Sequence, residues 1–272
     1  MANSINTNYG AAIALQNLNA TNAQLERTQN RVNTGMKVAT AKDNGAIFAI
    51  ATTQRANMGA MDAVKNSLQR GQSIVDVALA AGDTVTAALE EMRQLAVNIQ
   101  SSVAGSDAET AYLKDFNALG GEIDKALKGA SFDGVNLWNT TTATSLTTSV
   151  SGGTYEIGFG TTDKAVAAAV TAVSAGTAVR AGATTAIVDA AIKEITSDLA
   201  TLGTQSKSVG RQLTFVGKLQ DATEAGIGNL VDADLAKESA KLTALQTKQQ
   251  LGVQALSIAN SSSSILLNLF RS

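Results

Sequence analysis

A seven-residue repeat of apolar residues runs from residue 61 to residue 103 and restricts the fold more than any other feature of the sequence. Steps of three and four alternate along it for about six heptads, which is the period of an α-helical coiled coil. The repeat therefore predicts one long helix whose same side faces its partners throughout. Its members, with two glycines among them, are Met61, Val64, Leu68, Gly71, Val75, Ala78, Gly82, Val85, Leu89, Met92, Ala96, Ile99 and Val103.

The absence of proline supports the same conclusion, because proline removes an amide donor and clashes with the preceding turn of a helix. A second helix is predicted after Ser106, where Ser106 and Glu109 have the spacing of a capping box. A third long helix is predicted over residues 185–225. Between them, residues 145–150 and 154–159 have the pattern of two short strands joined in a hairpin.

Leaner apolar stripes with the same spacing occupy both ends of the chain. Each end would be marginal as an isolated helix, because most helix stability in proteins comes from packing. Pairing the two ends would still leave apolar surface in water, so we expect further copies of the chain to cover it. The candidate assembly residues on these stripes are Leu18, Leu25, Val32, Leu242, Leu245, Leu256, Leu266 and Phe270.

The expected fold is mainly α: a long helical coiled-coil rod with paired N- and C-terminal helices and a small β-hairpin insertion. The predicted domains are 1–43 with 233–272 for the terminal helices, 44–138 with 184–232 for the rod, and 139–183 for a short surface insertion. These divisions follow the helix pattern and the change of composition after residue 138.

Composition and charge exclude several classes of function. Without cysteine or histidine the chain has no disulfide, no Cys/His zinc site and no H-E-x-x-H metallopeptidase motif. A formal net charge of −2 without a basic block argues against nucleic acid as a partner. The first cationic residue is Arg27, so we expect no cleaved signal peptide, and no apolar run is long enough to span a membrane. We expect no enzyme activity and no cofactor.

Six segments of the chain resemble, in order, segments of bacterial flagellin, the subunit of the flagellar filament. RVNTGMKV resembles the family's RLSSGLRI, for example, and AKDNGA resembles its AKDDAA. The matches lie at both ends and along the helical body. They are SINTN at 4–8, RVNTGMKV at 31–38, AKDNGA at 41–46, LEEMRQLAV at 89–97, FDGVNL at 132–137, and DLAKE at 234–238 together with the closing helix 249–267.

The resemblance implies a structural subunit that polymerises into an extracellular filament for swimming motility. It implies that the two terminal segments pair as an inner domain, and that the subunit is exported by the flagellar secretion system. The implied partners are further copies of the chain, paralogous flagellins, the export apparatus and its chaperone, and hook-associated and cap proteins. An alternative is a hook–filament junction protein, which shares the terminal helices; a membrane-surface helix is a weaker one, because the C-terminal helix carries little charge.

Overall fold

The structure is a computed structural model that describes residues 8–140, 142–159, 173 and 175–269, with side chains up to residue 261. Its contacts divide the chain into two compact units, one of residues 1–56 with 222–272 and one of residues 57–221. The elements in order are α1 (Tyr9–Thr34), α2 (Gly45–Ser101), α3 (Asp107–Gly129), β1 (Thr144–Thr147), β2 (Thr154–Ile157), α5 (Thr185–Val231) and α6 (Leu235–Leu269). The unit boundaries lie inside α2 and α5, whereas the predicted domains divide in the loops beside residues 43 and 233.

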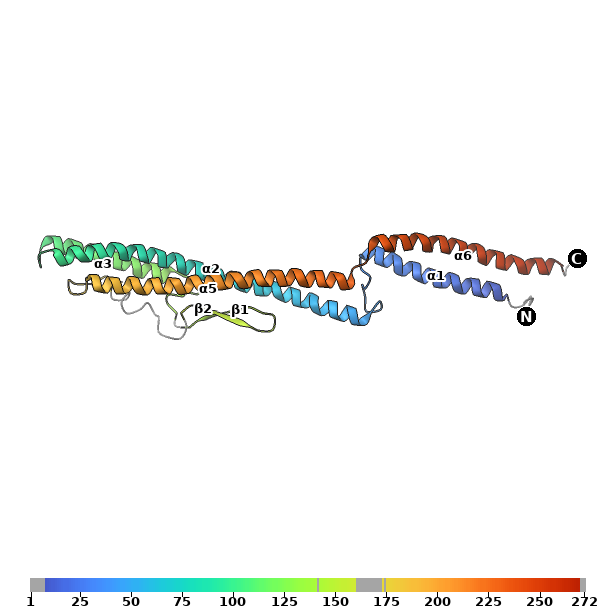
Figure 1. Cartoon of the computed structure of the whole chain (residues 1–272), viewed down its shortest axis with the longest axis horizontal. Coiled ribbons are helices and arrows are strands. Elements are labelled where there is room, and N and C mark those ends of the chain that lie inside the picture. Colours follow the sequence, from blue (N-terminus) through green and yellow to red (C-terminus); the bar gives the residue numbers. More distant parts are fainter. Residues whose placement is uncertain (1–7, 141, 160–172, 174, 270–272) are drawn as a thin grey trace. The chain divides into compact units, whose positions relative to one another are not determined.

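In the unit of residues 57–221, α2, α3 and α5 lie side by side as a helical bundle (Figure 1). α2 and α5 are antiparallel, because Gln72 donates to Ser206 at 2.6 Å while Arg93 pairs with Asp189 at 2.6 Å. Every apolar member of the seven-residue repeat from Met61 to Ile99 is buried. Val103 is the exception: it follows the end of α2 and is 78% exposed, so its assignment to the stripe was wrong.

The two glycines of the repeat have a packing reason. A Cβ built on Gly71 would lie 2.1 Å from Cδ1 of Leu146, and one on Gly82 would lie 2.4 Å from Cδ2 of Leu199. Leu146 belongs to β1. Because Gly71 has no side chain, Leu146 can pack directly against α2, and this contact holds the β-hairpin on the helix. The glycines interrupt the apolar series because neighbouring side chains occupy the space in their place.

The hairpin pairs β1 with β2 in antiparallel register, with Leu146 opposite Tyr155. Its strands are shorter than predicted, because the chain turns after Thr147 and Thr148 donates to the carbonyl of Gly153. Leu146 and Ile157 are both fully buried and belong to the same apolar core as the helices. The described part of the predicted surface insertion thus also contributes to the core of this unit.

Trp138 fixes the chain between α3 and the hairpin. Its indole Nε1 donates to the carbonyl of Ala78 on α2 at 2.9 Å, and its ring lies 5.2 Å from that of Phe159. The side chain is 2% exposed. A buried indole N–H needs a partner, and the Ala78 carbonyl supplies one that is compatible with an intact helix.

The start of α3 has the serine cap that the sequence predicts, but the reciprocal bond of the capping box is absent, because the amide of Ser106 donates to the carbonyl of Val103. The Ser106 hydroxyl accepts from the amide of Glu109 at 3.2 Å. The Glu109 carboxylate accepts from the amide of Gly105, one residue before the cap, and pairs with Arg180 at 2.9 Å. These contacts join the α2–α3 connection to the segment that precedes α5.

Candidate assembly surface

α1 and α6 lie side by side as an antiparallel helical hairpin in the unit of residues 1–56 and 222–272 (Figure 1). At one end of the hairpin, Asn8 Nδ2 donates to the carbonyl of Ala259 at 2.8 Å. Farther along, Gln249 donates to Asn22 at 2.9 Å. These contacts confirm that the first and last helices of the chain pair with each other.

Six of the eight predicted assembly residues lie along the seam between the two helices. Leu245 is buried, and the other five are half-buried. On α1, Thr21 and Thr28 alternate with the apolar seam residues, and both are buried although they are polar. Gly252 lets the helices approach, since a Cβ there would lie 3.2 Å from Leu18 Cδ1. The half-buried residues are Leu18, Leu25, Val32, Leu242 and Leu256.

The two remaining predicted residues, Leu266 and Phe270, are not described at the level of side chains. Leu266 is within the helix, but its side chain lies outside the described part. Phe270 lies beyond the described residues altogether. Their burial by another copy of the chain stays a prediction, as does that of the six seam residues.

A second set of apolar residues, which the sequence stripes missed, lies off the seam. Apolar side chains occur on several sides of α6, and α1 carries them beside its seam as well. Ile258 is 70% exposed and Leu251 is 59% exposed. Each of these residues lies one or two positions along the sequence from a stripe residue, and this spacing is the one sequence signal for a second apolar side of the helix. The exposed set comprises Tyr9, Ile13 and Leu15 on α1, and Leu251, Val253 and Ile258 on α6.

The paired ends of the hairpin carry no charged side chain. No Asp, Glu, Lys or Arg occurs in residues 1–25 or in residues 249–270. The contact between Asn22 and Gln249 places these two stretches together. A surface without charges can be buried against a neighbour without the desolvation penalty that an ionised group would add.

The opposite end of the hairpin is held by polar contacts within the chain. Arg31 pairs with Glu238 across the seam at 3.1 Å. Gly35 ends α1 with a positive φ of 70°, and its carbonyl accepts from the amide of Ala233 at 2.8 Å. Lys37 Nζ donates to the carbonyl of Asn229 at 3.0 Å. The charged side chains of segment 31–38, Arg31 and Lys37, therefore both make contacts within the molecule.

The loop between α1 and α2 is organised around one carboxylate. Asp43 accepts from the amide and hydroxyl of Thr40 at 3.0 and 3.1 Å, and from the amide of Ala39 at 3.2 Å. The Thr40 amide, more than any other donor, holds the pKa of Asp43 below its ordinary value. Asn44 then caps α2 by accepting from the amides of Ala46 and Ile47.

These features define a class of protein: a helical structural subunit whose paired, uncharged end exposes apolar residues on more than one side. No helix in the described part of the chain combines the length and apolar character that crossing a membrane requires. The chain belongs to the bacterial flagellin family. The family model for the bacterial flagellin N-terminal helical region matches residues 5–143, and that for the C-terminal helical region matches residues 185–270.

Relatives of similar length support the same assignment. The chain is 52% identical over 270 residues to flagellin FljM of Caulobacter vibrioides and 51% identical over 270 residues to flagellin FljK, with 99% of each chain covered. It is 37% identical over 282 residues to a flagellin of Brucella melitensis, which covers 98% of this chain and 99% of the relative. The chain is a subunit of the flagellar filament, and these relatives give no support to the hook–filament junction alternative.

Proposed function

We propose that copies of this chain polymerise by burying the exposed apolar faces of the α1–α6 hairpin against one another. The exposed apolar residues on both helices carry the proposal, because the hairpin cannot cover them with its own seam. The filament serves swimming motility, and the role of the chain is structural rather than catalytic.

The energetics favour assembly through this end of the molecule. Ile13, Leu15, Leu251, Val253 and Ile258 are each roughly half exposed or more, so complete burial would contribute about 1 kcal/mol for each side chain. No charged group on the same stretches opposes that gain. Repeated at each contact of the polymer, the apolar term exceeds what isolated surface ion pairs provide.

Folding of the terminal hairpin accompanies assembly in this proposal. In the part with described side chains, the seam of the helix pair buries one leucine and two threonines, which is little core for two helices. Two-element structures of this kind are marginal in water, and ordering the backbone costs about 1–2 kcal/mol per residue. Contacts with neighbouring copies offset this cost, so the hairpin becomes stable in the polymer.

The same proposal places the chain outside the cell after export by the flagellar secretion system, without a cleaved signal peptide. Its other partners are paralogous flagellins in a shared filament, an export chaperone, and hook-associated and cap proteins. Terminal helices that are marginally stable alone, with no charged side chain in residues 1–25 or 249–270, suit a subunit that passes through an export channel before it folds.

The test replaces exposed apolar residues and leaves the seam intact. The variant Leu251→Gln with Ile258→Gln should keep the helix content of the monomer, because both side chains are exposed. It should elongate seeded filaments at least tenfold more slowly, since about 2 kcal/mol of burial is lost at each addition. Pelleting assays and negative-stain microscopy measure the product.

The control is Val103→Gln, which changes an apolar residue of the other unit that is 78% exposed, more than Leu251 or Ile258. Its elongation rate should match that of the wild type. Wild-type elongation by the Leu251 and Ile258 variant would refute the proposed use of this surface.

A further inference from the structure

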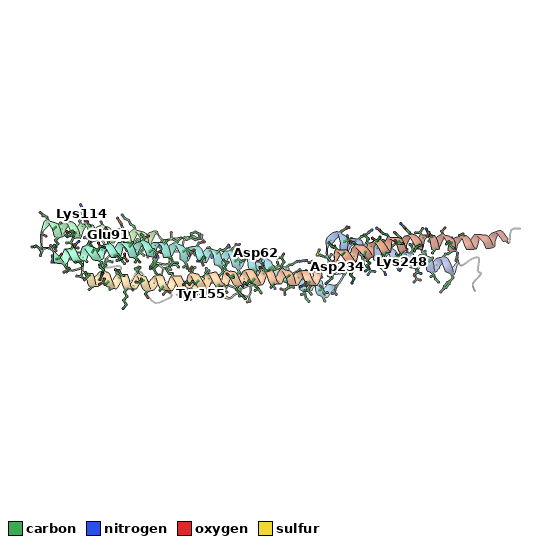
Figure 2. All side chains as sticks on the ribbon, turned by 45° about the horizontal axis from the view of Figure 1, so that its top comes forward. Asp62, Glu91, Lys114, Tyr155, Asp234 and Lys248 are labelled. Carbon is green, nitrogen blue, oxygen red and sulfur yellow. The ribbon has the colours of Figure 1, made fainter. Side chains whose placement is uncertain are left out.

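The unit of residues 57–221 carries an acidic row on α2. Residues 71–92 contain four acidic residues and neither lysine nor arginine. Asp76, Asp83 and Glu90 follow one another at seven-residue steps, so they share one side of the helix, and all three are exposed. Figure 2 shows the helix with Asp62 and Glu91 labelled, and this acidic row lies between them.

A basic face on α5 has the opposite composition. Residues 199–220 contain Lys207, Arg211 and Lys218 and no acidic residue. All three side chains are exposed. Arg211 and Lys218 are seven residues apart, about 10.5 Å along a helix, which is the same step that separates the members of the acidic row.

Neither set is neutralised inside the molecule. Among the described residues no ion pair joins a member of the acidic row or of the basic face to another charge, although Asp76 accepts a hydrogen bond from Gln72 at 2.9 Å. The neighbouring Arg93, in contrast, pairs with Asp189 on α5. An ion pair between α2 and α5 can therefore form on this surface. The three acidic residues of the row and the three basic residues of the face form none with described residues.

The acidic row and the basic face lie at different heights along the antiparallel helices. The Gln72–Ser206 and Arg93–Asp189 contacts place the acidic row beside α5 residues 189–206. The contact of Gln220 with Asp62 at 3.0 Å places Lys218 near the other end of the bundle. The offset between the centres of the two sets is about 20 Å. A second copy shifted along the bundle axis by about this distance would bring opposite charges together.

The surface beside the Glu90 end of the acidic row is hollowed. Glu90, Arg93, Asp189 and Ile192 line an open hollow of about 620 Å³ between α2 and α5. Continuing from Asp189 in seven-residue steps, the same side of α5 carries three glycines, and a Cβ on any of them would have nothing within 4 Å. Glycine lowers helix stability relative to alanine, and no contact with the described residues requires it there. The three are Gly203, Gly210 and Gly217.

We propose that the acidic row of one copy contacts the basic face of a second, axially shifted copy, and that this contact sets the stagger between neighbouring subunits. The inference rests on the proposed self-assembly of the chain. It follows from charge complementarity between two different patches of one molecule, which produces a head-to-tail contact that does not close on itself. A chain with net charge −2 and both patches is a better partner for itself than for a polyanion.

A cross-linking experiment tests the contact directly. Filaments are grown from an equal mixture of ¹⁴N- and ¹⁵N-labelled chains and treated with a zero-length carbodiimide, which joins a lysine amine to a carboxylate with loss of water. Mixed-isotope peptides that join Lys207 or Lys218 to the acidic row are expected. The proposal is overturned if these lysines cross-link only to other carboxylates, only within one chain, or not at all.

Charge exchange provides the second test. One variant reverses the acidic row, and another reverses the basic face; each should elongate seeds about tenfold more slowly than the wild type, because like charges then meet across two or three repeated contacts. A chain with both reversals restores opposite charges and should elongate within about threefold of the wild type. The first variant carries Asp76→Lys, Asp83→Lys and Glu90→Lys, and the second carries Lys207→Glu, Arg211→Glu and Lys218→Glu.

Controls separate this inference from the proposed function. Lys114→Glu with Asp115→Lys exchanges exposed charges on α3 and should leave elongation unchanged, and circular dichroism checks the helix content of every variant. If wild-type chains fail to elongate seeds, the proposed self-assembly is refuted. If the wild type elongates while the single reversals do so equally well, or the combined reversal does not recover, only the charge contact is refuted.

Discussion

At the scale of single residues, the glycines of the long helices divide into two kinds. Gly82 is enclosed, because a Cβ there would lie 2.4 Å from Leu199 and 3.0 Å from the ring of Trp138. Gly203 has nothing within 4 Å of the same position. The first kind is required by packing inside the chain, whereas no described residue packs against the second.

The two kinds should respond oppositely to alanine. Gly82→Ala should lower the free energy of unfolding of the 57–221 unit by about 1–3 kcal/mol, because Trp138 is held by its bond to Ala78 and has little freedom to move. Gly203→Ala should raise it by up to about 1 kcal/mol through helix propensity. Fluorescence of Trp138, the single tryptophan, reports both transitions. Equal effects of the two substitutions would contradict the packing argument.

The Glu109 carboxylate makes the end of the bundle sensitive to acid. The Gly105 amide and then Arg180 lower its pKa below the ordinary value of 4.5. Since the folded pKa is the lower one, the charged form stabilises the fold above pH 4.5, and this contribution is lost as the pH falls from there through the lowered value. Between pH 7 and about pH 3 the melting temperature of Glu109→Gln should therefore decrease less than that of the wild type. Glu122→Gln, an exposed change on the same helix, should follow the wild type.

At the scale of elements, the hairpin of β1 and β2 depends on its contact with α2. Leu146 is fully buried against Gly71, and the amide of Thr147 donates to the hydroxyl of Ser67 at 3.1 Å. Leu146→Ala should cost about 2–4 kcal/mol of unfolding free energy and accelerate hydrogen exchange in β1 and β2. Val150→Ala, at an exposed position of the same hairpin, should change neither quantity measurably.

The long helices could be predicted from the sequence because the same side of each helix is buried over many turns, which produces a regular spacing of apolar residues. The stripe from Met61 to Ile99 is buried in the structure, and the seam residues of α1 and α6 follow the predicted spacing. Pattern and packing agree wherever one side of a helix faces one neighbour over its whole length. The fold class follows from this agreement.

Other features could not be predicted because they depend on what lies opposite a residue. Nothing in the sequence near Gly71 identifies Leu146 as the side chain that packs against it. The exposed residues Leu251 and Ile258 are seven residues apart but fall outside the predicted stripe, so a search for one stripe omits them. The pairing of Glu109 with Arg180 joins residues far apart in the chain, and only the fold brings them together.

At the scale of the whole molecule, the two units differ in where their apolar residues are covered. The core of the 57–221 unit contains fully buried side chains from α2, α3, the hairpin and α5. The described seam of α1 and α6 contains one buried apolar side chain, Leu245, with the exposed apolar set beside it. One unit is thus stabilised by its own residues, whereas we propose that the other depends on neighbouring copies.

This difference predicts that the two units respond separately to truncation and to assembly. Removing residues 249–272 should leave the thermal transition reported by Trp138 unchanged, because the tryptophan and its contacts belong to the 57–221 unit. The same truncation should abolish elongation of seeds, since it removes the exposed residues Leu251, Val253 and Ile258 of α6. In the full chain, amides of α1 and α6 should exchange within seconds to minutes in dilute monomer and become protected in filaments, while the buried amides of α2 stay protected in both. Slow exchange of α1 and α6 in the monomer, or filament growth by the truncated chain, would show that the terminal hairpin is stable without its neighbours.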